Sequence, residues 1–114
     1  PSLVSVGSLL LDGGTGNDYL NVYSNDHWYN CEVNVTKSVQ YLGGNGNDTI
    51  LVKGTDSFGN VTVNMGNGDD SFTLYNSTVT GSLFVNGGSG NDRSDISYNN
   101  SWGSITHQFV ENIV

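Results

Sequence analysis

The chain has 114 residues, of which 35% are hydrophobic, and its eleven acidic and three basic side chains give a formal net charge of −8 at pH 7. This length suits one ordinary domain, and the low hydrophobic share leaves too few apolar side chains for a thick two-layer core. Such an acidic chain lacks the basic surface that nucleic acids and anionic membranes require, and no apolar run approaches the roughly 20 residues of a membrane-spanning helix.

In chain order, short apolar alternations lie on both sides of four glycine-rich segments, which we call the glycine loops. The loops span residues 13–18, 43–48, 65–70 and 87–92 and read GGTGND, GGNGND, MGNGDD and GGSGND. Alternation of apolar and polar residues is typical of half-buried strands, so a strand is predicted before and after each loop. The residue pairs that alternate in this way are Leu9/Leu11, Val39/Tyr41, Val61/Val63 and Leu83/Val85 before the loops, and Leu20/Val22, Ile50/Val52, Phe72/Leu74 and the less apolar Ser94/Ile96 after them.

The glycine loops recur at a regular interval, because they start at positions 13, 43, 65 and 87, which differ by thirty, twenty-two and twenty-two. The period is therefore twenty-two residues, with eight extra residues in the first coil that we place within residues 24–36. Strands that flank a turn at constant period wrap into a solenoid of stacked parallel strands. The alternative, an antiparallel meander with similar turns, needs no fixed register.

The sequence thus predicts an all-β fold, a parallel β-roll or β-helix solenoid of four to five coils with two strands and two turns per coil. Ile105 and His107 lie one full period beyond Leu83 and Val85 and start a fifth coil that lacks a glycine loop. His107 is expected to face inward as a satisfied core residue. We expect residues 1–114 to be a single solenoid domain and a segment of a longer chain.

Stacking at constant period aligns one aspartate from each loop in a column at a spacing of about 5 Å. Bare carboxylates at this spacing repel one another, which indicates that a cation lies between them. Calcium prefers about six to eight oxygen ligands and accepts carboxylates and backbone carbonyls. The column consists of Asp18, Asp48, Asp70 and Asp92.

Two further expectations concern the loop backbone. Glycines allow the carbonyls to turn towards the gap between coils. Such a loop needs the left-handed region, which the residue before each aspartate could tolerate, at Asn17, Asn47, Asp69 and Asn91. Two alternatives stay open: the acidic residues form only a solvated surface, or Gly-Asn turns hold a metal-free solenoid.

The glycine loops resemble the nonapeptide repeat G-G-x-G-x-D-x-U-x of the RTX (hemolysin-type) calcium-binding family, in which U is a large apolar residue. Residues 13–21 and 43–51 match it fully, with Leu20 and Ile50 at U, whereas Met65 replaces the first glycine of the third loop and Ser94 stands at U after the fourth. The resemblance implies a right-handed parallel β-roll with calcium between successive turns. It carries the metal-site role to Gly14, Gly16, Asp18, Gly44, Gly46, Asp48, Gly66, Gly68, Asp70, Gly88, Gly90 and Asp92.

The chain departs from the family pattern, which places two motifs in each coil, because it has one motif in each period. The resemblance therefore implies a single row of Ca²⁺ along one edge. Four loops leave three gaps and up to three ions, whose charge would offset most of the net −8. The gap that involves Asp92 is the weakest, because Ser94 replaces its apolar anchor.

The functional expectation is a calcium-binding structural module of a secreted or cell-surface protein of a bacterium, such as a stalk, adhesin or matrix component, which folds on binding calcium outside the cell. No set of residues indicates catalysis, so the chain is not expected to be an enzyme. The alternative is a carbohydrate-binding or accessory module of a polysaccharide-active protein, with glycan or partner contacts from Trp28, Tyr29, Tyr19, Tyr23 and Tyr75. Open sheet edges at both ends predict end-to-end self-association or contact with the remainder of a longer chain.

Overall fold

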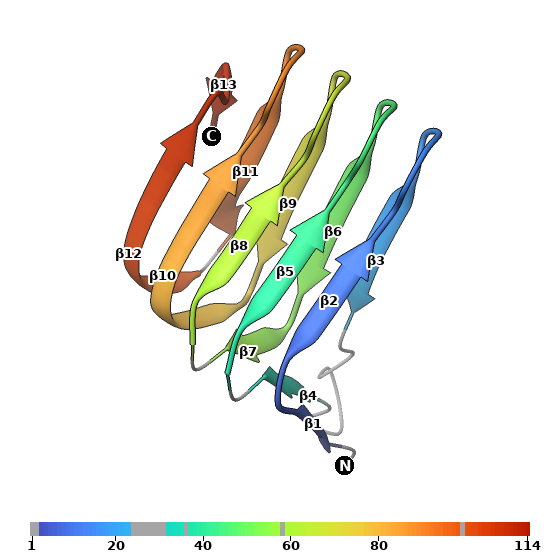
Figure 1. Cartoon of the computed structure of the whole chain (residues 1–114). Coiled ribbons are helices and arrows are strands. Elements are labelled where there is room, and N and C mark those ends of the chain that lie inside the picture. The colour runs from blue at the N-terminus through green and yellow to red at the C-terminus, as the bar shows by residue number, and fades with distance from the viewer. Residues whose placement is uncertain (1–2, 24–31, 36, 58, 99) are drawn as a thin grey trace.

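The computed structural model describes residues 3–23, 32–35, 37–57, 59–98 and 100–114, and these form an all-β parallel solenoid (Figure 1). It comprises about three turns, slightly fewer than the expected four to five coils. All pairings between the named strands are parallel, which excludes the antiparallel meander for the described residues.

The strands are short, as a chain with a turn every few residues requires. Their bounds are β1 Leu3–Val6, β2 Leu9–Asp12, β3 Tyr19–Tyr23, β4 Glu32–Val35, β5 Val39–Leu42, β6 Thr49–Lys53, β7 Thr55–Ser57, β8 Val61–Asn64, β9 Ser71–Tyr75, β10 Thr78–Asn86, β11 Arg93–Tyr98, β12 Ser101–Gln108 and β13 Asn112–Ile113. The predicted strands before and after the glycine loops are all present among them.

Each coil carries a third strand position that the sequence did not reveal. One sheet contains the strands before the loops, β2, β5 and β8, together with β1, β4 and β7, and the long strands β10 and β12. Strand β10 joins the two groups, because its start pairs with β7 and its end pairs with β8. The other sheet contains the strands after the loops, in the order β13-β11-β9-β6-β3. The expectation of two strands per coil is therefore wrong.

The pairing register locates the insertion of the first coil. Tyr23 pairs with Lys53, at a sequence offset of thirty, whereas Val33 pairs with Thr55, at an offset of twenty-two. The eight additional residues consequently lie between Tyr23 and Val33. This position lies within the expected range of 24–36, and β4 at the end of that range belongs to the regular stack. Trp28 and Tyr29 lie outside the described residues.

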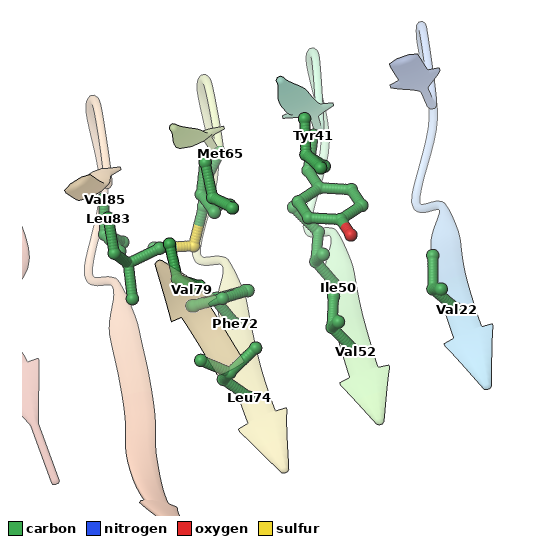
Figure 2. Packing of buried hydrophobic residues seen from close by; sticks show 13 residues of the cluster. Val22, Tyr41, Ile50, Val52, Met65, Phe72, Leu74, Val79, Leu83 and Val85 are labelled. Carbon is green, nitrogen blue, oxygen red and sulfur yellow. The ribbon is translucent and has the colours of Figure 1, made fainter. Parts of the chain in front are cut away.

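The interior is one apolar core in which the side chains of successive coils stack on one another, as Figure 2 shows. Val39, Ile50, Val63, Phe72 and Leu83 are each at most 1% exposed. Alternation places every second residue of a strand inside, and parallel pairing places equivalent residues on top of one another. The core is thin, so the loops at its edge must contribute to stability through their own contacts.

Glycine is required in the loops for two reasons. The second and fourth residues of every loop have φ between 87° and 128°, and a Cβ on Gly44 would collide with the Gly14 carbonyl of the preceding coil. We expect Gly44→Ala to lower the free energy of unfolding by about 3 kcal/mol, from backbone strain together with the forced separation of two coils.

Gly7→Ala is the matched control, because nothing lies within 4 Å of a Cβ at this position. It should change the free energy of unfolding by less than about 0.5 kcal/mol. Denaturant unfolding in calcium measures both variants, and equal destabilisation by the two substitutions would contradict the role given to Gly44.

Candidate metal centre in the glycine loops

The four glycine loops lie side by side along one edge of the solenoid (Figure 1). Isolated parallel bridges link their third residues in a continuous series, Thr15 to Asn45, Asn45 to Asn67 and Asn67 to Ser89. The register of the flanking strands thus continues through the loops, and the predicted stacking of the motif is present.

The last residue of each loop forms the predicted aspartate column, and most of it is buried. Asp48, Asp70 and Asp92 are 2%, 3% and 0% exposed. Each of these carboxylates accepts, through Oδ1, the backbone N–H of the aspartate in the preceding loop. The three donor–acceptor distances are 2.8 Å from Asp18 N to Asp48, 2.7 Å from Asp48 N to Asp70 and 2.9 Å from Asp70 N to Asp92.

The second oxygen of every aspartate in the column has no hydrogen-bond partner. The four atoms, which are buried, are the Oδ2 atoms of Asp18, Asp48, Asp70 and Asp92. Leaving a charged acceptor buried and unpaired is strongly unfavourable, and four such atoms at equivalent positions are no random defect. The repetition shows that one local environment, made by the motif, produces them.

The pKa values of the buried carboxyls reflect this environment. Burial, and then the charges of Asp92, Asp48 and Asp69, raise the pKa of Asp70 to about 6, although the hydrogen bond from Asp48 N–H lowers it. Burial, and then the charges of Glu111 and Asp69, likewise raise the pKa of Asp92 against the hydrogen bond from Asp70 N–H. Without a cation, the carboxyls of Asp70 and Asp92 therefore retain protons to a higher pH than an exposed aspartate does.

Carbonyl oxygens converge on the same places as the unpaired carboxylate oxygens. A Cβ added to Gly13 would meet the Gly43 carbonyl oxygen at 2.7 Å and Oδ2 of Asp18 at 2.9 Å. A Cβ on Gly43 would likewise meet the Met65 carbonyl oxygen and Oδ2 of Asp48. In these two loops the first residue is glycine because oxygens of its own loop and of the next loop crowd its Cα.

Oxygen atoms without donors suit a hard cation. None of the backbone hydrogen bonds that link the described loops ends on the carbonyl oxygens of Gly13, Gly43, Met65 or Gly87. Among the described residues, no three His, Cys, Asp or Glu side chains gather at one point. A cation in a gap would therefore bind carboxylates from two neighbouring loops and backbone carbonyls, which is an all-oxygen set that fits calcium.

The third loop differs from the others because Met65 has a side chain where they have a glycine. This side chain is fully buried and belongs to the apolar core. Burial is the largest contribution to the raised pKa of Asp70 in this loop, and it is also the largest for Asp92 in the fourth loop, which has Gly87 at the equivalent position.

The residue before each aspartate has a role that the sequence did not predict. None of Asn17, Asn47, Asp69 and Asn91 has a positive φ, so the left-handed expectation is wrong. The Oδ1 atoms of the first three instead accept the backbone N–H of the equivalent residue in the next loop, at 2.8 Å for Asn47 N and 2.9 Å for Asp69 N and Asn91 N. This second ladder connects the loops without using the aspartate column.

Glu111 is a residue of the column that sequence reasoning missed. Its Oε2 accepts the backbone N–H of Asp92 at 2.8 Å, as the next aspartate does in the earlier coils. The signal was its place directly before β13, because every aspartate of the column also stands directly before a strand. The missing glycines hid this equivalence.

The predicted aromatic contact residues Tyr19 and Tyr75 lie in one sheet but not in one row. Tyr19 is 61% and Tyr75 is 39% exposed, but they occupy different rows, since Tyr19 pairs with Thr49 whereas Tyr75 pairs with Lys53. The Lys53 ammonium lies 5.0 Å from the centre of the Tyr75 ring. Tyr23 is described only in its backbone, and Trp28 and Tyr29 are outside the described residues.

At the last coil the interior becomes polar. His107 faces inward and is half-buried, as expected, with its Nε2 3.0 Å from Oγ of Ser94. Burial lowers the pKa of His107. The hydroxyl of Ser94 thus has a partner inside the solenoid. Arg93 forms an ion pair with the neighbouring carboxylate of Asp95 at 3.3 Å, and not with an aspartate of the loops.

The comparisons with known proteins give no family for this chain. No protein-family model, no curated protein and no solved structure matches it. Among the described residues, no helix is long and apolar enough to cross a lipid bilayer.

Proposed function

We propose that this chain is a calcium-binding structural module of a secreted or cell-surface protein, built as a β-roll of four to five coils. The observation that carries the proposal is the row of four buried, unpaired Oδ2 atoms. The Oδ2 atoms of Asp18, Asp48 and Asp92 lie beside a carbonyl oxygen of the next turn, and divalent cations would bind between successive loops. The glycine residues are required by the close approach of the coils, and the carboxylates would supply the charge that a cation needs.

Calcium in this row would stabilise the folded chain and would not take part in a catalysed reaction. Two neighbouring carboxylates repel each other across a gap, and a divalent ion between them converts that repulsion into attraction. Because the unfolded chain has no preformed gap, the binding free energy adds to the free energy of folding. Extracellular calcium modules bind at about 10⁻⁴–10⁻³ M, so the roll would fold outside the cell and be unstable at cytosolic calcium.

The residues that would hold the ions are those of the motif. Carboxylates would come from Asp18, Asp48, Asp70 and Asp92, and carbonyls from the loop glycines and Met65. The carbohydrate-binding alternative rests on Tyr19 and Tyr75, and because these side chains occupy separate rows we favour the structural module.

The direct test of this function is chelation. In excess EDTA we expect the circular dichroism of the β structure to fall and the midpoint of thermal unfolding to drop by more than about 10 °C, given several kcal/mol of lost binding energy in a domain of this size. Magnesium should restore little of the signal, because its small octahedral shell suits these gaps poorly. A spectrum and a midpoint unchanged by EDTA would exclude calcium-dependent folding.

A further inference from the structure

The strongest unexplained feature lies at the end of the aspartate column, in the turn that follows β12. His107 and Gln108 pair with Val85 and Asn86 at the regular offset of twenty-two, but Asn112 pairs with Arg93 at an offset of nineteen. The turn between them is therefore three residues shorter than a glycine loop. It contains Phe109, Val110 and Glu111, and none of them is glycine.

This shortened turn supplies two oxygen atoms at places equivalent to those of a glycine loop. The carboxylate of Glu111 accepts the N–H of Asp92 at 2.8 Å, within the range of the bonds between the aspartates. The carbonyl oxygen of Phe109 crowds the Cα of Gly87, as the carbonyls of Gly43 and Met65 crowd the first glycines of the first two loops. The backbone follows the same path, with Gly87 N–H donating to Gln108 O at 2.9 Å and Asn112 N–H to Asp92 O at 3.0 Å.

The local backbone is held in an unfavourable conformation to make this arrangement. Phe109 has φ of 52°, and it is one of two described non-glycine residues with positive φ. A bulky residue in the left-handed region loses about 1–3 kcal/mol, which the surrounding structure must offset. The Phe109 side chain is 63% exposed, so its own burial offsets little of that loss. What the conformation achieves is the placement of the Phe109 carbonyl beside Asp92.

The gap also contains an acceptor without a donor. Asp92 is 0% exposed, and its Oδ2 has no hydrogen-bond partner. This oxygen lies 2.6 Å from the Cβ position of Gly87, on which the Phe109 carbonyl also converges.

From these observations we infer that Glu111 replaces the aspartate of a fifth loop and completes a fourth calcium site with the carboxylate of Asp92 and the carbonyl of Phe109. The inference rests on the proposed calcium function and extends it beyond the glycine motif. The longer side chain of glutamate bridges the distance left by the shortened turn. The row of cations then ends on a turn that needs no glycine.

The experiment counts calcium ions in three proteins by calorimetric titration after removal of metal with chelator. The wild-type chain should bind four ions and Glu111→Gln should bind three. Gln keeps an oxygen that accepts the Asp92 N–H, so the end of the column stays connected. Asp69→Asn is the matched control, because it removes one loop charge while the other loops have asparagine at this position, and it should bind four ions.

Stability measurements separate a cation site from a simple hydrogen-bonded cap. A cap would be weakened by Glu111→Gln equally in calcium and in EDTA, whereas a cation ligand would show its loss only in calcium. Equal ion counts for wild type and Glu111→Gln, or three ions in the wild type, would overturn the inference and leave the proposed function standing. No binding to any of the proteins would overturn both. If Glu111→Gln fails to fold in calcium, the wild-type count of four or three decides.

Discussion

Asp48→Asn is expected to remove two calcium ions, whereas Asp18→Asn should remove one. Asp48 lies between two neighbouring loops, since its Oδ1 accepts the N–H of Asp18 and its own N–H donates to Asp70. Asp18 has a described glycine loop on one side only. With calcium at about 100 times each dissociation constant, every occupied site adds about 2.7 kcal/mol to the free energy of unfolding. Losing two sites should therefore cost Asp48→Asn about 5 kcal/mol in calcium, and losing one should cost Asp18→Asn about half of that.

In EDTA, Asp48→Asn should no longer lower the free energy of unfolding. Asparagine keeps the oxygen that accepts the N–H of Asp18, but it removes a negative charge from a residue that is 2% exposed. Removing an unpaired buried charge is favourable when no cation balances it. Asp48→Asn should therefore be as stable as wild type in EDTA or more stable, and denaturant unfolding in both buffers measures the difference.

Asp69→Asn is again the control for charge, because Asp69 belongs to the second ladder and accepts Asn91 N–H through Oδ1. It should bind as many ions as wild type. Should Asp48→Asn destabilise the protein equally in calcium and in EDTA, the aspartate column would be a hydrogen-bonding device and not a cation site.

The calcium-free protein should be more stable at pH 5 than at pH 7.5. Burial raises the pKa of Asp70 from 3.8 to about 6, and the pKa of Asp92 is raised as well. Between the unfolded and the folded pKa the native state binds more protons than the unfolded chain, so stability falls as the pH rises through about 6. Asp70 alone gives a slope of up to about 1.4 kcal/mol per pH unit in that window.

Calcium should invert this dependence, because protons and calcium compete for the same carboxylates. In saturating calcium the protein should be more stable at pH 7.5, and the apparent affinity for calcium should fall below pH 6. His107 acts against the calcium-free trend, since its lowered pKa makes protonation below about 6.5 favour the unfolded chain.

Thermal unfolding of wild type and Asp70→Asn in EDTA at the two pH values isolates the carboxyl contribution. The gain of stability at pH 5 should shrink in Asp70→Asn, which cannot take up a proton at this position. A wild-type protein that is less stable at pH 5 than at pH 7.5 in EDTA would contradict the raised pKa values of Asp70 and Asp92.

Much of the fold could be predicted because one physical constraint dominates it. Asp48, Asp70 and Asp92 are spaced at one constant interval, and parallel stacking is the arrangement that gives all three the same surroundings. The alternation of apolar and polar residues then identifies the side chains that point inward. The third strand of each coil could not be predicted in this way. Strand β7, Thr55–Ser57, is three polar residues long and carries no apolar alternation. Its pairing comes from neighbouring coils and not from its own sequence.

At the site, the features that follow from the repeat could be predicted, and those of single residues could not. The register predicts the aspartate column, but it does not predict which oxygen of each aspartate accepts a hydrogen bond and which has no partner. Asn47 was expected in a left-handed turn, although its side chain makes a hydrogen bond to the next coil. Glu111 escaped notice because a change of turn length breaks the period on which the sequence argument depended. The contact between Glu111 and Asp92 replaces one that a full-length loop would make, and it can be recognised only in the folded structure, where the coils stack.

A calorimetric titration of calcium into the wild-type protein after removal of metal decides between a calcium-binding and a metal-free solenoid. At least three ions per chain should bind, with dissociation constants in the range of about 10⁻⁴–10⁻³ M and a gain of β structure on the same samples. No binding, with the β structure intact throughout, would show that hydrogen bonds between the loops hold a metal-free solenoid.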